Sequence, residues 1–424
     1  MHALTASNRR RIAGVALGVG VWFFLTPGGV TLQAYADDGS WTAESQPAES
    51  LPPESQPAES QLPESQLPES LPPESLPPES QPAESWTPEM VGETAAARAP
   101  VAALIEAERR SLAQGSGRRR HGDGGEAGLM QAVLGHMADH ERNRVAGQAL
   151  ELHWRVIGLR LQLDVADESL EVLERLTSMA ERAEELDVPD GDPGEARGRM
   201  LEARDTRVRL EYGERLARRR LAGLLGHQDD WGESLVLVGN LPSELAVVTT
   251  TDAVEIALAR RSDLRAAETL CRCMTADNLP AARAMLGVLR PGLGMAISAA
   301  TRPTLLAGMH QGSAEQAELQ CRRQQCRILR DSIRDSIRDE VAVADSGLWE
   351  AGQRVRLARE RWEIAERSAR RSESAVGLDR QPPGSDLLSR LEMLRLRGEW
   401  VQRRVELALA DVRLRQAQGI LPGP

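Results

Sequence analysis

The chain has 424 residues, of which 41% are hydrophobic, 27% are charged and only 3% are aromatic. Its formal net charge of −11 is concentrated in the first 90 residues, where ten glutamates and two aspartates face three arginines. The other 334 residues therefore carry a net charge of only −2. A nearly neutral region of this kind offers no overall basic field for nucleic acid, so a nucleic-acid partner is not expected.

The first 36 residues have the pattern of an export signal. Arg9–Arg11 supply a positive start, Ile12–Leu25 an apolar core, and Ala34–Ala36 a small-residue cleavage site before Asp37. The apolar run is too short for a comfortable membrane span. We therefore predict that residues 1–36 are a signal peptide that directs export, with an uncleaved N-terminal anchor as the alternative.

Residues 37–90 are a low-complexity linker that contains pentads such as Gln46–Ser50 and Leu71–Ser75. Proline and like charge favour a solvated, polyproline-type chain that buries no core. We expect a disordered Pro/Glu/Ser spacer. A ligand for a proline-recognising or cell-wall partner is the alternative, and no specific motif supports it.

One long helix, expected from about Ser332 to Val376, organises the rest of the chain. Its apolar residues recur at alternating steps of four and three, which places them on one helix stripe that partner helices must cover. The residues of this heptad seam are Ile333, Ile337, Val341, Ala344, Leu348, Ala351, Val355, Ala358, Trp362, Ala365 and Ala369.

The same seam occurs earlier in the chain, and an offset of 192 residues superimposes the two runs. Its members are Val145, Ala149, Leu152, Val156, Leu159, Leu163, Ala166, Leu170 and Leu173. Each run is followed by a turn rich in helix breakers, at 189–193 and 382–386, and then by a shorter return helix. At an offset of 193, the apolar residues Leu201, Val208, Tyr212 and Leu216 correspond to Leu394, Val401, Val405 and Leu409. The sequence therefore predicts an all-α, internally duplicated fold of long antiparallel helical hairpins, with repeats over 91–240 and 241–424.

Four cysteines, Cys271, Cys273, Cys321 and Cys326, all lie in the second repeat. A zinc site usually has two cysteine pairs with a two-residue gap in each, and these spacings differ from that. In an exported protein an even count suggests disulfides. Either of the first two cysteines could pair with either of the last two, and unpaired thiols remain the alternative.

No residue pattern in the chain indicates an enzyme. His136 and His140 share one helix face, but Met137 stands where the metalloprotease pattern requires a glutamate. The chain has no glycine-rich phosphate loop after a strand and no serine nucleophile elbow. We therefore expect no catalytic residues, no cofactor and no metal site.

Two stretches resemble the TolC-like outer-membrane efflux proteins. Val248–Glu268, with the helix caps Thr251 and Asp252, is similar to the segment that opens each repeat of that family. Trp349–Leu421 is similar to the last hairpin of the family, including its glycine-containing turn and the closing Gly419-Ile-Leu-Pro422. Together with the duplication, the resemblance covers about 145–422.

The resemblance implies an exported homotrimer whose helices form an α-barrel across the periplasm. Helices 144–188 and 315–376 would be the long staves of a coiled-coil barrel, and 195–225 and 386–418 the short returns. The turns would dock to a periplasmic adaptor protein that connects to an inner-membrane pump. The residues expected to bind that partner are Asp190, Gly191, Asp192, Pro193, Gln381, Pro382, Pro383 and Gly384.

The sequence departs from the family at the other end of the hairpins. Gly115–Gly125 is rich in glycine and arginine and cannot lie in lipid, and 290–309 could hold at most two short strands without aromatic residues. We therefore expect little or no β-barrel. Two interpretations remain open: an outer-membrane-factor-like duct of an efflux or type I secretion system, at the outer membrane or in the periplasm, and a periplasmic helical scaffold that has lost the membrane pore.

Overall fold

This computed structural model describes residues 85–116, 124–186, 193–227, 235–244, 249–289, 311–378, 382 and 384–421. All of them belong to one unit of the chain, Pro82–Pro424. The signal peptide, most of the linker and the 290–309 segment lie outside the described residues. The predictions made for them are therefore not tested.

The described part of the chain is built almost entirely from helices, as the sequence predicts. The helices are α1 (Pro88–Ala97), α2 (Pro100–Ser116), α3 (Gly124–Glu185), α4 (Pro193–Leu224), α6 (Thr250–Arg260), α7 (Ser262–Cys273), α8 (Leu279–Leu289), α10 (Gln311–Val376) and α11 (Ser385–Gln418). Two short strands, β1 (Ser85–Trp86) and β2 (Val236–Leu237), pair in parallel with Ser85 opposite Val236. Strand β1 and the start of α1 lie within the range assigned to the linker.

The long helix α3 begins about twenty residues before the expected start at 144. Leu129 and Val133 extend its apolar face upstream, where they are buried against α7 and α8. Helix α10 likewise begins about twenty residues before the start at Ser332 that its seam predicts, and four residues before the start at 315 that the resemblance implies, while α4 and α11 begin within two residues of their expected starts. The early start of α3 was missed because the upstream apolar residues pack on helices outside the hairpin, so they do not continue the hairpin seam.

The ends of the two return helices confirm the duplication. Gly226 follows α4 with φ 71°, and Gly419, 193 residues later in the chain, follows α11 with φ 68°. Each end is also capped by an arginine, because Arg98 donates from Nη1 to Leu225 O at 2.5 Å and Arg261 from Nη1 to Ala417 O at 3.3 Å. Glycine adopts this left-handed conformation readily, so both helices end in the same way.

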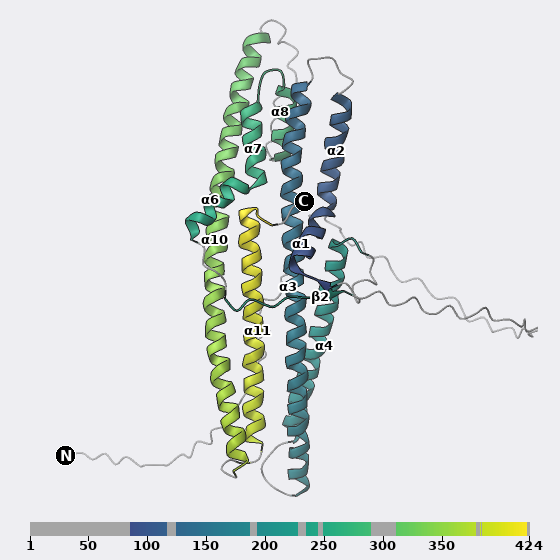
Figure 1. Ribbon diagram of the computed structural model, residues 1–424, viewed down its shortest axis with the longest axis vertical. Helices are drawn as coiled ribbons and strands as arrows, with labels where there is room; N and C mark the ends of the chain where they lie inside the picture. The colour runs from purple at the N-terminus through teal and green to yellow at the C-terminus, as the bar shows by residue number, and fades with distance from the viewer. Residues whose placement is uncertain are drawn as a thin grey trace, which may run out of the picture. The chain divides into compact units, whose positions relative to one another are not determined.

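Four long helices of the unit lie side by side in the order α4, α3, α11, α10 (Figure 1). Helix α3 packs against both return helices, and α11 packs against both long helices. Past the ends of the return helices, α2 takes the place of α4 beside α3, and α7 takes the place of α11 between α3 and α10. Helix α10 therefore forms one edge of the layer, beside α11 and α7. Helices α4 and α2 form the other edge, beside α3.

A segment at 235–244 crosses the helices of the first repeat. Leu235, Leu237 and Leu241 are buried in the core cluster of α1, α3 and α4. Arg160 of α3 donates from Nη1 to Leu237 O at 3.3 Å, and Arg404 of α11 donates to Leu241 O. The segment thus ties α3 to α11 and closes the core of the first repeat.

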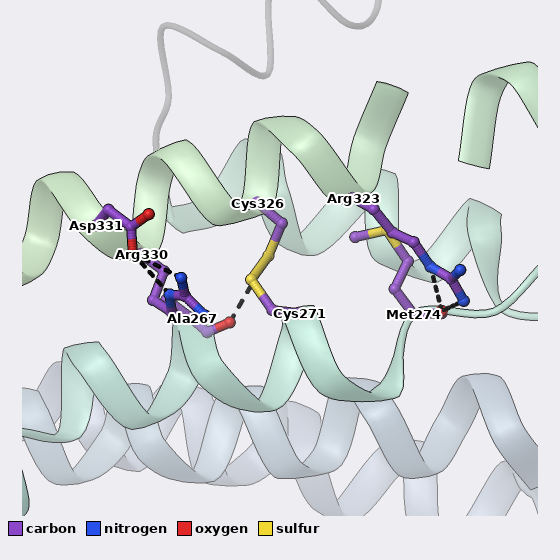
Figure 2. Close-up of a disulfide and its surroundings, with 7 residues drawn as sticks. All are labelled: Ala267, Cys271, Met274, Arg323, Cys326, Arg330 and Asp331. Atoms are coloured by element: carbon purple, nitrogen blue, oxygen red, sulfur yellow. Dashed lines mark hydrogen bonds and ion pairs between the residues drawn. A yellow bond between two sulfur atoms is a disulfide. The ribbon is translucent and has the colours of Figure 1, made fainter. Parts of the chain in front are cut away.

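Figure 2 shows a disulfide between Cys271 of α7 and Cys326 of α10, whose Cα atoms are 5.6 Å apart. It is one of the pairings that the sequence left open. Beside it, Arg323 of α10 donates from Nη2 to Met274 O at 2.8 Å, just past the end of α7. Cys273 is half-buried and Cys321 is exposed, and both are free thiols.

Candidate functional site

The hairpin ends are only partly within the described residues. Pro193 is the first residue of α4, a position that suits proline because its missing N–H has no helical partner there. Gly384 precedes α11 and lies beside Leu176 and Met179 near the end of α3, so the second hairpin end adjoins the first hairpin. Pro382 is also described. Asp190, Gly191, Asp192, Gln381 and Pro383 lie outside the described residues, and the docking role of all eight stays a prediction.

The two edges of the helix layer carry exposed apolar side chains. On α4, Leu201, Val208 and Tyr212 are 60%, 59% and 69% exposed, and we call this set the α4 edge. On α10, the corresponding set, which we call the α10 edge, contains Trp349, Leu357 and Ile364, which are 66%, 55% and 58% exposed. Each set falls on one stripe of its helix, since the spacings are close to multiples of a helical turn.

The residues of the α4 edge are predicted from the sequence only as part of a seam, and the α10 edge is not predicted. The signal for the α10 edge is a second apolar stripe with near-heptad spacing, at Trp349, Leu357 and Ile364, outside the seam that packs on α11. It was hidden because the seam already accounts for one covered face of α10. A helix that needs partners on two faces carries two such stripes.

A groove of about 800 Å³ runs along the contact between α10 and α11. Val343 and Ala351 supply apolar lining, while Arg413, Glu406 and Glu340 supply charge. The acidic and basic side chains are mixed, so the groove selects neither an anion nor a cation by net charge.

Arg261 forms the charged centre at one end of this groove. Its guanidinium donates to both carboxylate oxygens of Asp263, at 2.9 and 2.6 Å, and to Glu340 Oε2 at 2.7 Å. Burial alone would raise the pKa of Asp263, but the hydrogen bonds and charge of Arg261 outweigh it and hold that pKa below its ordinary value. Arg261 therefore joins the α6–α7 corner to α10 and α11, which is a structural role.

His153 of α3 is fully buried at the seam of the first repeat. Its ring lies edge-to-face with Trp154, at 5.1 Å between centroids, and against Gly239 of the crossing segment. Burial lowers the pKa of His153 from about 6.5 to about 4, and the nearby carboxylate of Glu89 opposes this only in part. The imidazole is therefore neutral at physiological pH and packs as a core side chain.

Within the described ranges, no cluster of three or more histidine, cysteine, aspartate or glutamate side chains is arranged to hold a metal ion. His136 is partly buried, and burial lowers its pKa. Among the described helices, none has a long enough apolar stretch to cross a membrane.

The sequence matches no protein-family model, and no curated protein matches it. Three solved structures are similar in fold. A membrane protein from Pseudomonas aeruginosa matches with a TM-score of 0.53 and 14% identity, covering 69% of this chain and 72% of its own. The outer membrane protein VceC from Vibrio cholerae matches with a TM-score of 0.52 and 14% identity, covering 70% and 74%. The Campylobacter jejuni CmeC outer membrane channel matches with a TM-score of 0.53 and 10% identity, covering 69% and 66%.

These likenesses agree with the resemblance seen in the sequence. The chain therefore has the helical-hairpin fold of the TolC-like outer-membrane channels, at 10% to 14% sequence identity.

Proposed function

We propose that the protein is an outer-membrane-factor-like component of an efflux or type I secretion system. It is exported to the outer membrane or periplasm, assembles as a homotrimer and serves as a passive duct across the periplasm. Its hairpin ends dock to a periplasmic adaptor protein that connects to an inner-membrane pump. It is not an enzyme, and the choice of transported solute lies largely with the pump.

The observation that carries this proposal is the pair of uncovered edges. A self-contained scaffold would fold its two hairpins face to face and leave no apolar edge uncovered. Here the helices lie in one layer, and apolar side chains are exposed at both of its edges. A layer with two apolar edges is suited to assembly into a closed wall, because burying exposed leucine, valine and isoleucine side chains lowers the free energy.

The alternative is a periplasmic helical scaffold or interaction protein that has lost the membrane pore. What favours it is the Gly115–Gly125 stretch, whose glycines and arginines are incompatible with lipid. Such a protein could keep the hairpin fold and bind partners without conducting solutes.

Membrane fractionation of the native protein, followed by mass determination in mild detergent, separates the two functions. We expect a trimer in the outer-membrane fraction. A soluble periplasmic monomer or dimer would contradict the duct and support the scaffold.

A further inference from the structure

The internal duplication lets one contact inside the chain predict a contact between chains. Helix α11, the return helix of the second repeat, packs against α3, the long helix of the first repeat. Exchanging the two repeats turns this contact into one between α4 and α10. Within one chain, α4 and α10 form opposite edges of the layer, so this contact is available only between two copies.

The side chains at the exchanged positions are suitable for such a contact. Within the chain, Val165 and Val172 of α3 enclose Leu394 of α11, and all three are at most 2% exposed. Adding 192 to the positions of Val165 and Val172 gives Leu357 and Ile364 of α10. Subtracting 193 from the position of Leu394 gives Leu201 of α4. These are apolar residues of the α10 and α4 edges, and each is more than half exposed.

Further positions extend the correspondence along both helices. Ile157 of α3, which is 7% exposed, corresponds to Trp349 at 66%, and Val401 of α11, at 4%, corresponds to Val208 at 59%. Val405, which is partly buried against the same core, corresponds to exposed Tyr212. These six buried apolar residues thus have apolar counterparts on the exposed edges. The correspondence does not extend to the end of α11, because Ala146 and Val412, which share a buried cluster, correspond to Arg338 and Arg219.

A charged pair is preserved in the same way. Arg397 of α11 donates from Nη1 to both carboxylate oxygens of Glu168 on α3, at 2.7 and 3.0 Å. The exchanged positions are Arg204 on α4 and Glu360 on α10, so the signs of the charges are kept. Glu360 is exposed, and Arg204 reaches only Glu174 of its own chain, at 3.5 Å.

We propose that the α4 edge of one copy packs against the α10 edge of the next copy in the register that α11 adopts against α3. The inference rests on the proposed assembly and adds its residue-level interface. The contact is heterologous, because each copy presents a different face to each neighbour, and it therefore leads to a ring when the rotation closes. Leu201 lies between Leu357 and Ile364 of the neighbour, and Arg204 pairs with the neighbour's copy of Glu360.

Cysteine cross-linking in the full-length chain tests this register. A Cβ built on Gly398 of α11 lies 3.6 Å from Val165 Cγ1 of α3, so side chains at these two positions are in contact. The exchanged positions are 205 and 357. We expect Asp205→Cys with Leu357→Cys, in a background where Cys273 and Cys321 are serine, to give covalent dimers and trimers on mild oxidation.

Two controls establish the register and the heterologous character. Asp205→Cys with Val343→Cys keeps the same helix face, since Val343 lies two heptads before Leu357 and is 74% exposed, but it shifts the second thiol by about 21 Å along α10 and should not cross-link. Neither single variant alone should cross-link, whereas a mixture of Asp205→Cys and Leu357→Cys chains should give dimers and no trimers.

The outcomes separate this inference from the proposed function. An oligomer of native mass that lacks the 205–357 cross-link, or cross-links equally well through 205–343, overturns the interface and leaves the duct in place. A cross-linked oligomer found only in the soluble periplasmic fraction supports the interface and overturns the duct. A monomer overturns both.

Discussion

The two return helices, α4 and α11, carry the same apolar pattern in different surroundings. Leu394 and Val401 of α11 are 0% and 4% exposed, whereas their counterparts Leu201 and Val208 of α4 are 60% and 59% exposed. Helix α11 lies between two long helices, and α4 contacts only α3 among them. An apolar stripe therefore shows that a surface must be covered, but it does not show whether the same chain or another copy covers it.

The largest difference between the two helices should appear in matched truncations. Leu394→Ala removes a fully buried side chain from the Val165–Val172 cluster and should lower the free energy of unfolding by about 2–5 kcal/mol. Leu201→Ala changes an exposed residue and should alter the unfolding of the isolated chain by less than about 0.5 kcal/mol. Denaturant unfolding of the dissociated chain measures both effects.

In assembly the order of the two effects should be reversed, with Leu201→Ala having the larger effect. Leu201→Ala should reduce the oligomeric fraction by native mass measurement at conditions where the chain remains folded. If Leu201→Ala assembles like the unmodified protein, the apolar contribution of the α4 edge to the interface is contradicted.

A second difference between the repeats is the disulfide. Cys271 and Cys326 join α7 to α10, whereas the position of the first repeat that corresponds to Cys326 is Leu134 of α3. Closing a loop of 55 residues stabilises the fold by about 4 kcal/mol in the chain-entropy model. Cys271→Ser should therefore lower the free energy of unfolding by about 2–4 kcal/mol.

The free cysteines provide the matched control for the disulfide. Cys273→Ser and Cys321→Ser should change the unfolding midpoint little, and a reducing agent should lower that midpoint in the unmodified chain but not in Cys271→Ser. Equal losses in all three variants would show that burial of sulfur, and not the covalent bond, supplies the stability.

Much of the fold was predictable from local spacing. The heptad seams, the helix breakers after each seam and the repeat offset were sufficient to predict both hairpins, because each depends on residues close together in the sequence. The upstream part of α3 was missed because Leu129 and Val133 pack on helices of the second repeat. Their burial depends on residues more than 130 positions away, which no local pattern reveals.

The candidate site was less predictable than the fold. The docking role of the hairpin ends came from resemblance, and five of the eight residues lie outside the described ranges. The α10 edge was missed because Leu357 and Ile364 lie outside the seam that packs on α11 and are more than half exposed. The disulfide pairing was also beyond the sequence, since it depends on how α7 and α10 are aligned.

Titration should distinguish the repeats as well. His153 is buried beneath the crossing segment in the first repeat, and its counterpart Asp345 in the second repeat accepts a hydrogen bond from Thr250. Because the pKa of His153 is lowered to about 4 in the folded chain, the unfolded chain binds the proton more readily. The free energy of unfolding should therefore decrease by about 3 kcal/mol as the pH falls from about 6.5 towards 4.

Replacement of the imidazole isolates this contribution. His153→Gln should flatten the dependence of the unfolding free energy on pH between 4 and 6.5. His136→Gln is the matched control, because His136 is only partly buried and should contribute less. An unchanged pH dependence in His153→Gln would rule out His153 as its source.

The two hairpin ends differ in charge, which bears on docking. Asp190 and Asp192 lie in the first turn, while Gln381–Gly384 carries no charged side chain. Reversing both aspartates, Asp190→Arg with Asp192→Arg, should weaken adaptor binding by roughly 1 kcal/mol, or about fivefold, without unfolding the hairpin. Adaptor pull-down measures this. Glu255→Arg with Asp277→Arg, two exposed positions far from the turn in sequence, should leave binding unchanged, and an equal loss there would remove the assignment to the first turn.

The smallest effect should come from exchanging charges across the proposed interface. Arg204→Glu or Glu360→Arg alone places like charges together, and each should weaken assembly by about 0.2–1 kcal/mol. The double variant should recover part of this loss, because the opposite charges face each other again. A double-mutant cycle on the oligomer dissociation constant measures the coupling.

The pair Arg397 and Glu168 supplies the matched control, since it makes the same contact within one chain. Exchanging its charges should affect unfolding and show no coupling in the dissociation constant. If Arg204 and Glu360 show no coupling in assembly but Arg397 and Glu168 show it in unfolding, the correspondence between the two contacts stops at the apolar residues. A coupling of similar size in both cycles would mean that the chain uses one interface twice, once within itself and once with its neighbour.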